Sequence, residues 1–184
     1  MLGVSNTMGL LSKNVGYGLK MGQLDHRWDI ILKLFFDRPS QDFQLRELSR
    51  LTKIPKTTIQ RSLQELLKMK IIQKNKKGVF PLYSANETNF WYKFYKKYFL
   101  LKRINKSGLV DYLNESLHPQ CVVLFGSGAK GDYVRKSDLD IFLLCSEKDI
   151  PLNQFEKKLD RKINLLFKED YDSLSPELFN NVVN

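Results

Sequence analysis

Apolar residues near the start of the chain repeat at the spacing of an amphipathic helix. The stripe predicts a helix that begins near Arg27 and ends before Pro39, because proline cannot continue the hydrogen-bond pattern. The apolar members of this stripe are Trp28, Ile31, Leu32, Leu34 and Phe35. No such periodicity runs through residues 1–24, which are glycine-rich and are expected to form a loose leader.

The next apolar positions predict a short strand and two short helices. Phe43 and Leu45 alternate as in a strand, and the residues that follow predict a helix over residues 45–52. A break at Pro55 precedes another helix that runs to about Met69. The apolar faces of the two helices hold Leu45, Leu48 and Leu51, and then Ile59, Leu63, Leu66 and Leu67.

A lysine-rich turn between two short apolar segments predicts a hairpin. Residues 71–73 and 79–83 have the composition of strands, and residues 74–78 (KNKKG) have that of the turn. The order of helix, short strand, helix, turn, helix and hairpin resembles a winged helix-turn-helix domain over residues 27–84. The resemblance lies in the pattern, since no single residue in it is diagnostic.

This resemblance implies a DNA-binding surface. In such domains the second helix of the turn lies in the major groove, and the hairpin touches the backbone or the minor groove. The residues placed to contact DNA are Lys56, Thr57, Thr58, Gln60, Arg61 and Gln64 on the helix, and Lys74, Lys76 and Lys77 at the hairpin tip. A module for dimerisation or protein docking is the alternative that the pattern leaves open.

Charge is distributed unevenly along the chain. Residues 1–106 carry 21 Lys and Arg against 7 Asp and Glu, a net of +14, whereas residues 107–184 carry 9 against 13, a net of −4. A basic half suggests a polyanionic partner, and an acidic half with clustered aspartates is what a magnesium site requires. Lysines on solvated helix faces would give the same basic count without any such partner.

Seven aromatic residues lie among lysines between positions 88 and 104. Phe90, Phe94 and Tyr98 repeat on one face of the expected helix, which favours packing between two domains or two subunits. Stacking of bases on these rings is the other interpretation. A further helix is expected from Gly108 to Leu117, followed by a loop that contains His118.

A glycine-rich turn follows an apolar strand in the acidic half. Residues 121–125 (CVVLF) predict a strand buried on both faces, which ends at Gly126-Ser127-Gly128, and such a turn presents backbone N–H groups to an anion. Asp138 and Asp140 open the next apolar strand and share one of its faces, about 6 to 7 Å apart at Cα. Two like charges at this spacing favour a shared magnesium ion. Alone, either motif is commonplace.

Together, the residues GSGAKGDYVRKSDLDIFLL resemble the signature of the minimal nucleotidyltransferases of the DNA polymerase beta superfamily, in which GS, ten residues and DxD form the defining motif. The resemblance implies that Gly126 and Ser127 hold a nucleoside triphosphate, that Lys130 touches phosphate, and that Asp138 and Asp140 coordinate Mg²⁺ or Mn²⁺. It favours ATP among the nucleotides.

The family normally adds a third carboxylate from the strand that follows the next helix. Here residues 152–162 predict that helix, residues 163–167 predict the strand, and the matching position is Asn164. An asparagine can offer a carbonyl oxygen to a metal, but it cannot take the proton of an attacking hydroxyl. Glu169 lies about 16 Å further along an extended strand and is a poor substitute. Nucleotide binding is therefore better supported than turnover.

We therefore expect an α+β protein in which a winged helix-turn-helix domain precedes a small nucleotidyltransferase fold of mixed sheet and flanking helices. The expected segments are a leader (1–24), the winged helix (25–86), an aromatic linker helix (87–106) and the nucleotidyltransferase domain (107–184). The two cysteines, Cys121 and Cys145, are expected to be buried thiols. No membrane span or signal sequence is apparent, so a cytoplasmic location is expected.

The leading hypothesis is a metal-dependent transfer of an NMP group from an NTP to a macromolecule, directed by a DNA-binding winged helix. Members of the family act as antitoxins that modify a partner toxin, so the resemblance makes a protein acceptor plausible. The alternative is a DNA-binding regulator that only senses a nucleotide, which Asn164 favours. A scaffold with two docking modules is a third reading, and a homodimer is compatible with each.

Overall fold

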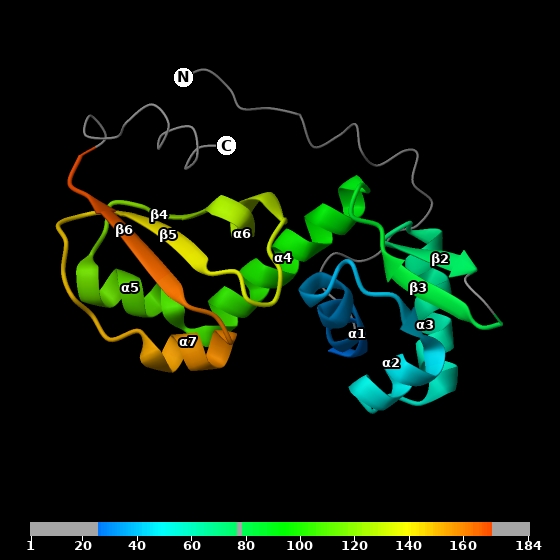
Figure 1. The fold of residues 1–184 in the computed structure, drawn as a ribbon. Helices are drawn as coiled ribbons and strands as arrows, with labels where there is room; N and C mark the ends of the chain where they lie inside the picture. The colour runs from blue at the N-terminus through cyan, green and yellow to red at the C-terminus, as the bar shows by residue number, and fades with distance from the viewer. Residues whose placement is uncertain (1–25, 77–78, 171–184) are drawn as a thin grey trace, which may run out of the picture.

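A computed structural model describes residues 26–76 and 79–170 and shows two units of helix and sheet that share one long helix (Figure 1). The protein is α+β, as expected, with a small mixed sheet and flanking helices in its C-terminal part. The predicted leader lies outside the described residues. None of the helices described is long and apolar enough to cross a membrane.

The N-terminal unit contains three helices and a three-stranded antiparallel sheet. The sheet order is β1-β3-β2, and a single core of apolar side chains lies between the sheet and the helices. The elements are α1 (His26–Asp37), β1 (Phe43–Gln44), α2 (Leu45–Thr52), α3 (Lys56–Lys68), β2 (Ile72–Lys76) and β3 (Pro81–Ala85). This is the order of elements that the apolar pattern predicts, with helix ends within a residue or two.

The hairpin differs in one respect from the sequence prediction. Strand β2 extends three residues further than expected, β3 is displaced by two residues toward the C-terminus, and Lys74 lies within β2, opposite Tyr83, rather than at the tip. The reason is that main-chain pairing continues through polar residues, which a search for apolar runs overlooks. Lys76 is the last residue of β2, and Lys77 lies outside the described residues.

Helix α4 (Phe90–Ser107) belongs to both units. Asn89 caps it, because its side-chain oxygen accepts hydrogen bonds from the N–H groups of Trp91 (2.8 Å) and Tyr92 (3.3 Å). The first half of the helix packs into the N-terminal core, and Leu100 and Ile104 pack into the C-terminal core. The helix therefore bridges two cores, as predicted.

The expected aromatic stripe of α4 is not the face that the core buries, although Phe94 packs against the N-terminal core. Phe90 is 70% exposed and Tyr98 is 40% exposed, whereas Tyr92, Tyr95 and Phe99 are buried. Aromatic residues lie on several sides of this helix, so a 3.6-residue stripe can be drawn through more than one set of them. The spacing alone could not choose between the faces.

The C-terminal unit is a three-stranded mixed sheet covered on one face by helices (Figure 1). The strand order is β4-β5-β6; β4 and β5 are antiparallel, and β5 and β6 are parallel. The elements are α5 (Leu109–Leu117), β4 (Val122–Phe125), α6 (Gly126–Lys130), β5 (Leu139–Leu144), α7 (Asn153–Leu159) and β6 (Ile163–Lys168). The parallel pairing brings the starts of β5 and β6 to the same end of the sheet.

Three details of this unit correct the sequence predictions. Strand β4 lies at the edge of the sheet and is half-buried along its length, rather than buried on both faces. The turn at Gly126 is the first turn of the five-residue helix α6. Cys121 and Cys145 are only partly buried. His118 is exposed and ends α5 in a left-handed conformation, in keeping with the predicted loop.

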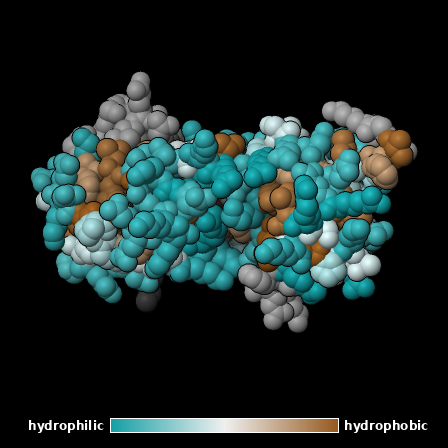
Figure 2. Space-filling model, turned by 60° about the horizontal axis from the view of Figure 1, so that its bottom comes forward, coloured by the Kyte–Doolittle hydropathy of each residue, from teal (hydrophilic) through white to brown (hydrophobic). Residues whose placement is uncertain are grey.

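Polar side chains cover most of the face shown in Figure 2, with apolar patches over both ends of the molecule. The middle of this face, where the two units meet, is mostly hydrophilic. One contact across the junction is the ion pair between Lys102, in the second half of α4, and Asp29 in α1 (2.7 Å).

Candidate functional site

The two predicted aspartates and Asn164 meet at one end of the C-terminal sheet. Phe125, the last residue of β4, lies opposite Asp140 in β5, and Asp140 lies opposite Asn164 in β6. Asp138 immediately precedes β5 and shares the face of Asp140, because side chains alternate along a strand. The intervening Leu139 is fully buried in the core. We call Asp138, Asp140 and Asn164 the carboxylate row.

The side-chain amide of Asn164 bridges the two carboxylates. Its nitrogen donates to Asp140 Oδ1 at 3.0 Å and approaches Asp138 Oδ2 at 3.4 Å. Asp138 and Asn164 are exposed, and Asp140 is half-buried. The amide supplies partial positive charge where two like charges face each other, and so offsets part of their repulsion.

Gly126 lies directly against Asp140. A Cβ atom at this position would come within 2.6 Å of Asp140 Oδ2, and the backbone φ of Gly126 is +66°. Both the close approach and the left-handed conformation therefore require glycine. The start of α6 is thus held next to the carboxylate row, which explains why the GS and DxD motifs occur together.

Helix α6 carries the other two residues predicted to hold a nucleotide. Ser127 is half-buried in its first turn, and Lys130 is exposed at its last residue. Gly128 lies on the opposite side, where a Cβ would come within 3.1 Å of Leu100 in α4. The small side of α6 therefore packs on α4, and the structure brings Gly126 and Ser127 to the edge of the sheet that carries the row.

The entry into β6 is fixed by hydrogen bonds that align it with β5. Glu156 in α7 accepts the N–H of Ile163 at 3.1 Å, and this bond lowers the pKa of the Glu156 carboxyl. The N–H of Leu139 donates to the Lys162 carbonyl oxygen at 2.8 Å. Because register determines which side chains stand opposite each other, these bonds place Asn164 beside Asp140.

The donor atoms of the row suit a hard divalent cation. Carboxylate oxygens are the ligands preferred by Mg²⁺ and Mn²⁺, and the Asn164 amide can turn its oxygen toward a metal. Within the described residues, no group of three or more His, Cys, Asp or Glu side chains could hold a metal ion. Asn164, opposite Asp140, contributes an amide rather than a third carboxylate to the row.

One comparison with known proteins bears on this site. Residues 108–181 match the family model described as Polymerase beta, Nucleotidyltransferase. The match includes Gly126, Ser127 and the whole carboxylate row, and it supports a place for this segment in the nucleotidyltransferase superfamily. Searches among curated proteins and among solved structures give no match. We refer to the matched segment below as the nucleotidyltransferase segment.

The residues predicted to bind DNA lie on α3 and in the hairpin. Lys56, Thr57, Gln60, Arg61 and Gln64 are exposed on α3, Thr58 is half-buried, and Lys74 is exposed within β2. A pocket of about 350 Å³ lies beside these residues, between α1 and α3. The residues that line it are Arg27, Trp28, Thr57, Thr58, Arg61, Ser62 and Glu65. The sequence did not predict that Arg27 and Ser62 lie beside these residues, because the contact between α1 and the start of α3 leaves no local pattern.

Proposed function

We propose that the nucleotidyltransferase segment binds an NTP, ATP being the first candidate, and transfers its NMP group to a macromolecular acceptor. The observation that carries the proposal is the packing of Gly126 against Asp140 beside Asp138. A phosphate-binding turn and a pair of acidic side chains then lie at one edge of one sheet. The family match over residues 108–181 supports the same chemistry.

Each residue of the site has a proposed role. Backbone N–H groups at Gly126 and Ser127 would hold the triphosphate, with Lys130 at its phosphates. Asp138 and Asp140 would hold Mg²⁺ or Mn²⁺, with the Asn164 oxygen as a further ligand. When bound, such a cation supplies charge neutralisation for the triphosphate. The residues of the row thereby orient the α-phosphate toward the acceptor.

The transfer itself requires an attacking hydroxyl and a place for its proton. The hydroxyl oxygen forms a bond to the α-phosphorus in line with the leaving group, and the bond to pyrophosphate breaks. Asn164 cannot accept the proton of the hydroxyl. The proton must therefore pass to Asp138, to Asp140 or to water. Turnover should therefore be slow compared with that of an enzyme that has three carboxylates.

Nucleotide sensing is the second candidate function, and the bridge formed by Asn164 favours it. An amide that donates to both carboxylates stabilises the pair without supplying a base. A site of this kind could bind a nucleotide tightly and release it unchanged. In that case the chain would act through its N-terminal unit as a nucleotide-responsive regulator of transcription.

We also propose that the N-terminal unit is a winged helix-turn-helix that binds DNA. Its element order, its β1-β3-β2 sheet and the exposed polar face of α3 support this assignment. Exposed Lys56 and Arg61 would contact phosphates or base edges. The unit would then locate or regulate the transferase in the cytoplasm. A protein acceptor such as a toxin partner, and a homodimer, are compatible with this arrangement.

Transfer of label tests the catalytic proposal directly. The purified protein is incubated with host lysate, Mg²⁺ or Mn²⁺ and each of the four α-labelled NTPs, with Asp138→Ala as the control. Label on a protein or nucleic-acid band that requires Asp138 is the expected result. Nucleotide binding by calorimetry without any transfer would instead favour the sensor, and the absence of both would reject the site.

A further inference from the structure

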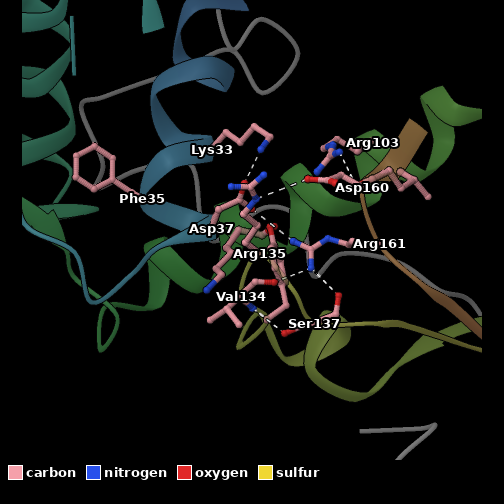
Figure 3. A network of polar contacts seen from close by, with 12 residues as sticks. Lys33, Phe35, Asp37, Arg103, Val134, Arg135, Ser137, Asp160 and Arg161 are labelled. Atoms are coloured by element: carbon pink, nitrogen blue, oxygen red, sulfur yellow. Dashed lines mark hydrogen bonds and ion pairs between the residues drawn. The ribbon is translucent and has the colours of Figure 1, made fainter. Parts of the chain in front are cut away.

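Arg161 is a buried arginine just before β6, three residues from Asn164. Its side chain is 2% exposed, and the other arginines in the described part of the chain are more accessible to solvent. One terminal nitrogen of the guanidinium donates to two backbone carbonyls, Val134 O at 2.6 Å and Ser137 O at 2.8 Å (Figure 3). Arg161 therefore clamps the backbone at both ends of a four-residue turn.

That turn leads directly to the carboxylate row. The N–H of Ser137 donates to the Val134 carbonyl oxygen at 3.0 Å, and the Ser137 hydroxyl accepts the N–H of Val134 at 2.9 Å. The next residue is Asp138. Because the turn closes on itself and on Arg161, the position of the Asp138 backbone depends on the guanidinium.

The other end of the guanidinium faces the N-terminal unit. Its second terminal nitrogen lies 3.5 Å from Asp37 Oδ1, and Asp37 is the buried last residue of α1. Asp37 makes a second link across the junction, since its carbonyl oxygen accepts the N–H of Arg135 at 3.1 Å. Lys33, one turn earlier in α1, also pairs with the Asp37 carboxylate (Figure 3). The end of α1 is thus bonded to the turn directly, through Arg135, and indirectly, through Arg161.

Tyr133 completes the surroundings of Arg161. The guanidinium carbon lies 4.7 Å from the centre of the Tyr133 ring, and the Tyr133 hydroxyl donates to the Lys96 carbonyl oxygen in α4 at 2.9 Å. The Nε atom of Arg161 is buried with no hydrogen-bond partner in the described residues. Burial of a charge with an unsatisfied donor is costly, and a buried ion pair is a weak source of stability. Such pairs are better suited to fixing one arrangement of parts.

We propose that Arg161 is a positioning residue for the carboxylate row, and that Asp37 makes the position of the Asp138 turn depend on the N-terminal unit. Only the consequence for nucleotide binding rests on the function proposed above. If DNA or another partner moves α1 on binding, the movement would change the position of Asp138 through Asp37, Arg161 and the 134–137 turn. The converse holds as well, because coupling between two sites is reciprocal.

Amide hydrogen exchange of the protein without nucleotide tests whether Arg161 holds the 134–137 turn in place. The reporters are the amides of residues 134–139, four of which are hydrogen-bonded at the turn or just after it. In Arg161→Lys, which keeps the charge but loses the fork, we expect these amides to exchange about tenfold faster, with α5 unchanged. Unchanged exchange at 134–139, or an equal increase in α5, would overturn the role of Arg161.

Asp37→Asn tests the link between the units and leaves the buried arginine in place. We expect faster exchange at the 134–139 turn as well as at the end of α1. An increase confined to α1 would overturn the coupling. Arg135→Ala is the matched control, because its exposed side chain pairs with exposed Asp160, at 3.7 Å, and among the described residues it donates to no backbone carbonyl of the turn. It should leave the reporters unchanged.

Nucleotide binding tests the consequence separately. Calorimetry with a non-hydrolysable ATP analogue and Mn²⁺ should show affinity weakened about tenfold in Arg161→Lys and less in Asp37→Asn, with Arg135→Ala like the wild type. If the wild type binds no nucleotide, the proposed function fails while the exchange experiment still decides the coupling. If Arg161→Lys binds nucleotide with wild-type affinity while its 134–139 amides exchange faster, the turn does not position the row.

Discussion

The protein has two clusters of charged side chains that follow opposite rules. The carboxylate row places exposed Asp138 and half-buried Asp140 side by side at one end of a sheet, with the Asn164 amide donating to them. The junction between the units buries Lys96, Asp37 and Arg161 at 8% exposure or less. An open cluster of like charge can accept a cation, whereas a closed cluster of mixed charge can only fix its neighbours in place.

The largest expected effect comes from the contact between Gly126 and Asp140. In Gly126→Ala the new methyl group would displace the Asp140 carboxylate, and we expect metal-dependent nucleotide affinity to fall about a hundredfold. Gly108→Ala is the matched control, since φ at Gly108 is also positive (+81°) but no atom lies within 4 Å of the added carbon. Both variants should lose about 1 kcal/mol of stability. Equal nucleotide affinity in the two variants, measured by calorimetry, would contradict this role of Gly126.

The buried Lys96 gives the next largest effect, on stability. Burial between aromatic rings lowers its pKa from 10.5 to about 8. Above about pH 8 the folded protein releases this proton while the unfolded chain retains it until near pH 10.5. The free energy of unfolding should therefore rise with pH in this window, by about 2 to 3 kcal/mol if no other group interferes.

Several ionisable groups face Lys96 and shape this profile. They are Tyr92 and Tyr133, whose rings it contacts, and the charges of Glu87, Asp132, Arg161 and Asp37. Burial raises the pKa of both tyrosines, so stability should fall again above pH 10, when only the unfolded chain loses those protons. Lys96→Met should be more stable at pH 7 and should lack the rise. Parallel denaturant-unfolding profiles for the two proteins would exclude a buried lysine charge.

Asn164→Asp tests the carboxylate row by adding a third negative charge to it. A third carboxylate beside Asp138 and Asp140 should lower the melting temperature without metal, because three like charges then share the edge. Mn²⁺ should raise the melting temperature more in this variant than in the wild type. If the protein is a slow transferase, label transfer should increase about tenfold or more, since a general base becomes available. Transfer by the wild type at the rate of the variant would show that Asn164 is not limiting.

The carboxylate row could be predicted from the sequence, and the junction could not. Period-2 alternation put Asp138 and Asp140 on one face, and the resemblance to nucleotidyltransferases, which carry a third carboxylate on the strand after the next helix, led to Asn164. Asp37 and Arg161 are 124 residues apart and have no shared local pattern, so only the folded chain brings them together. Lys96 lies among similar lysines in α4, and periodicity in a helix with aromatic residues on several sides did not show that this lysine is the buried one.

The smallest effect concerns DNA binding by α3. Arg61→Ala should weaken the affinity for duplex DNA several-fold and reduce the slope of log affinity against log salt by about 1, as expected for one lost phosphate contact. Lys157→Ala in α7, an exposed lysine of the other unit, serves as the control. The same loss in both variants would indicate attraction by net charge alone, and salt-independent binding would contradict a phosphate contact.

Calorimetric titration of ATP with Mg²⁺ into the wild type and Asp140→Asn tests the nucleotide site most directly. This substitution keeps the size of the side chain and removes one of the two charges that face Asn164. Metal-dependent binding by the wild type that Asp140→Asn abolishes is the expected result. Equal affinity in the two proteins, or no binding by the wild type with any of the four NTPs, would contradict a nucleotide and metal site at the carboxylate row.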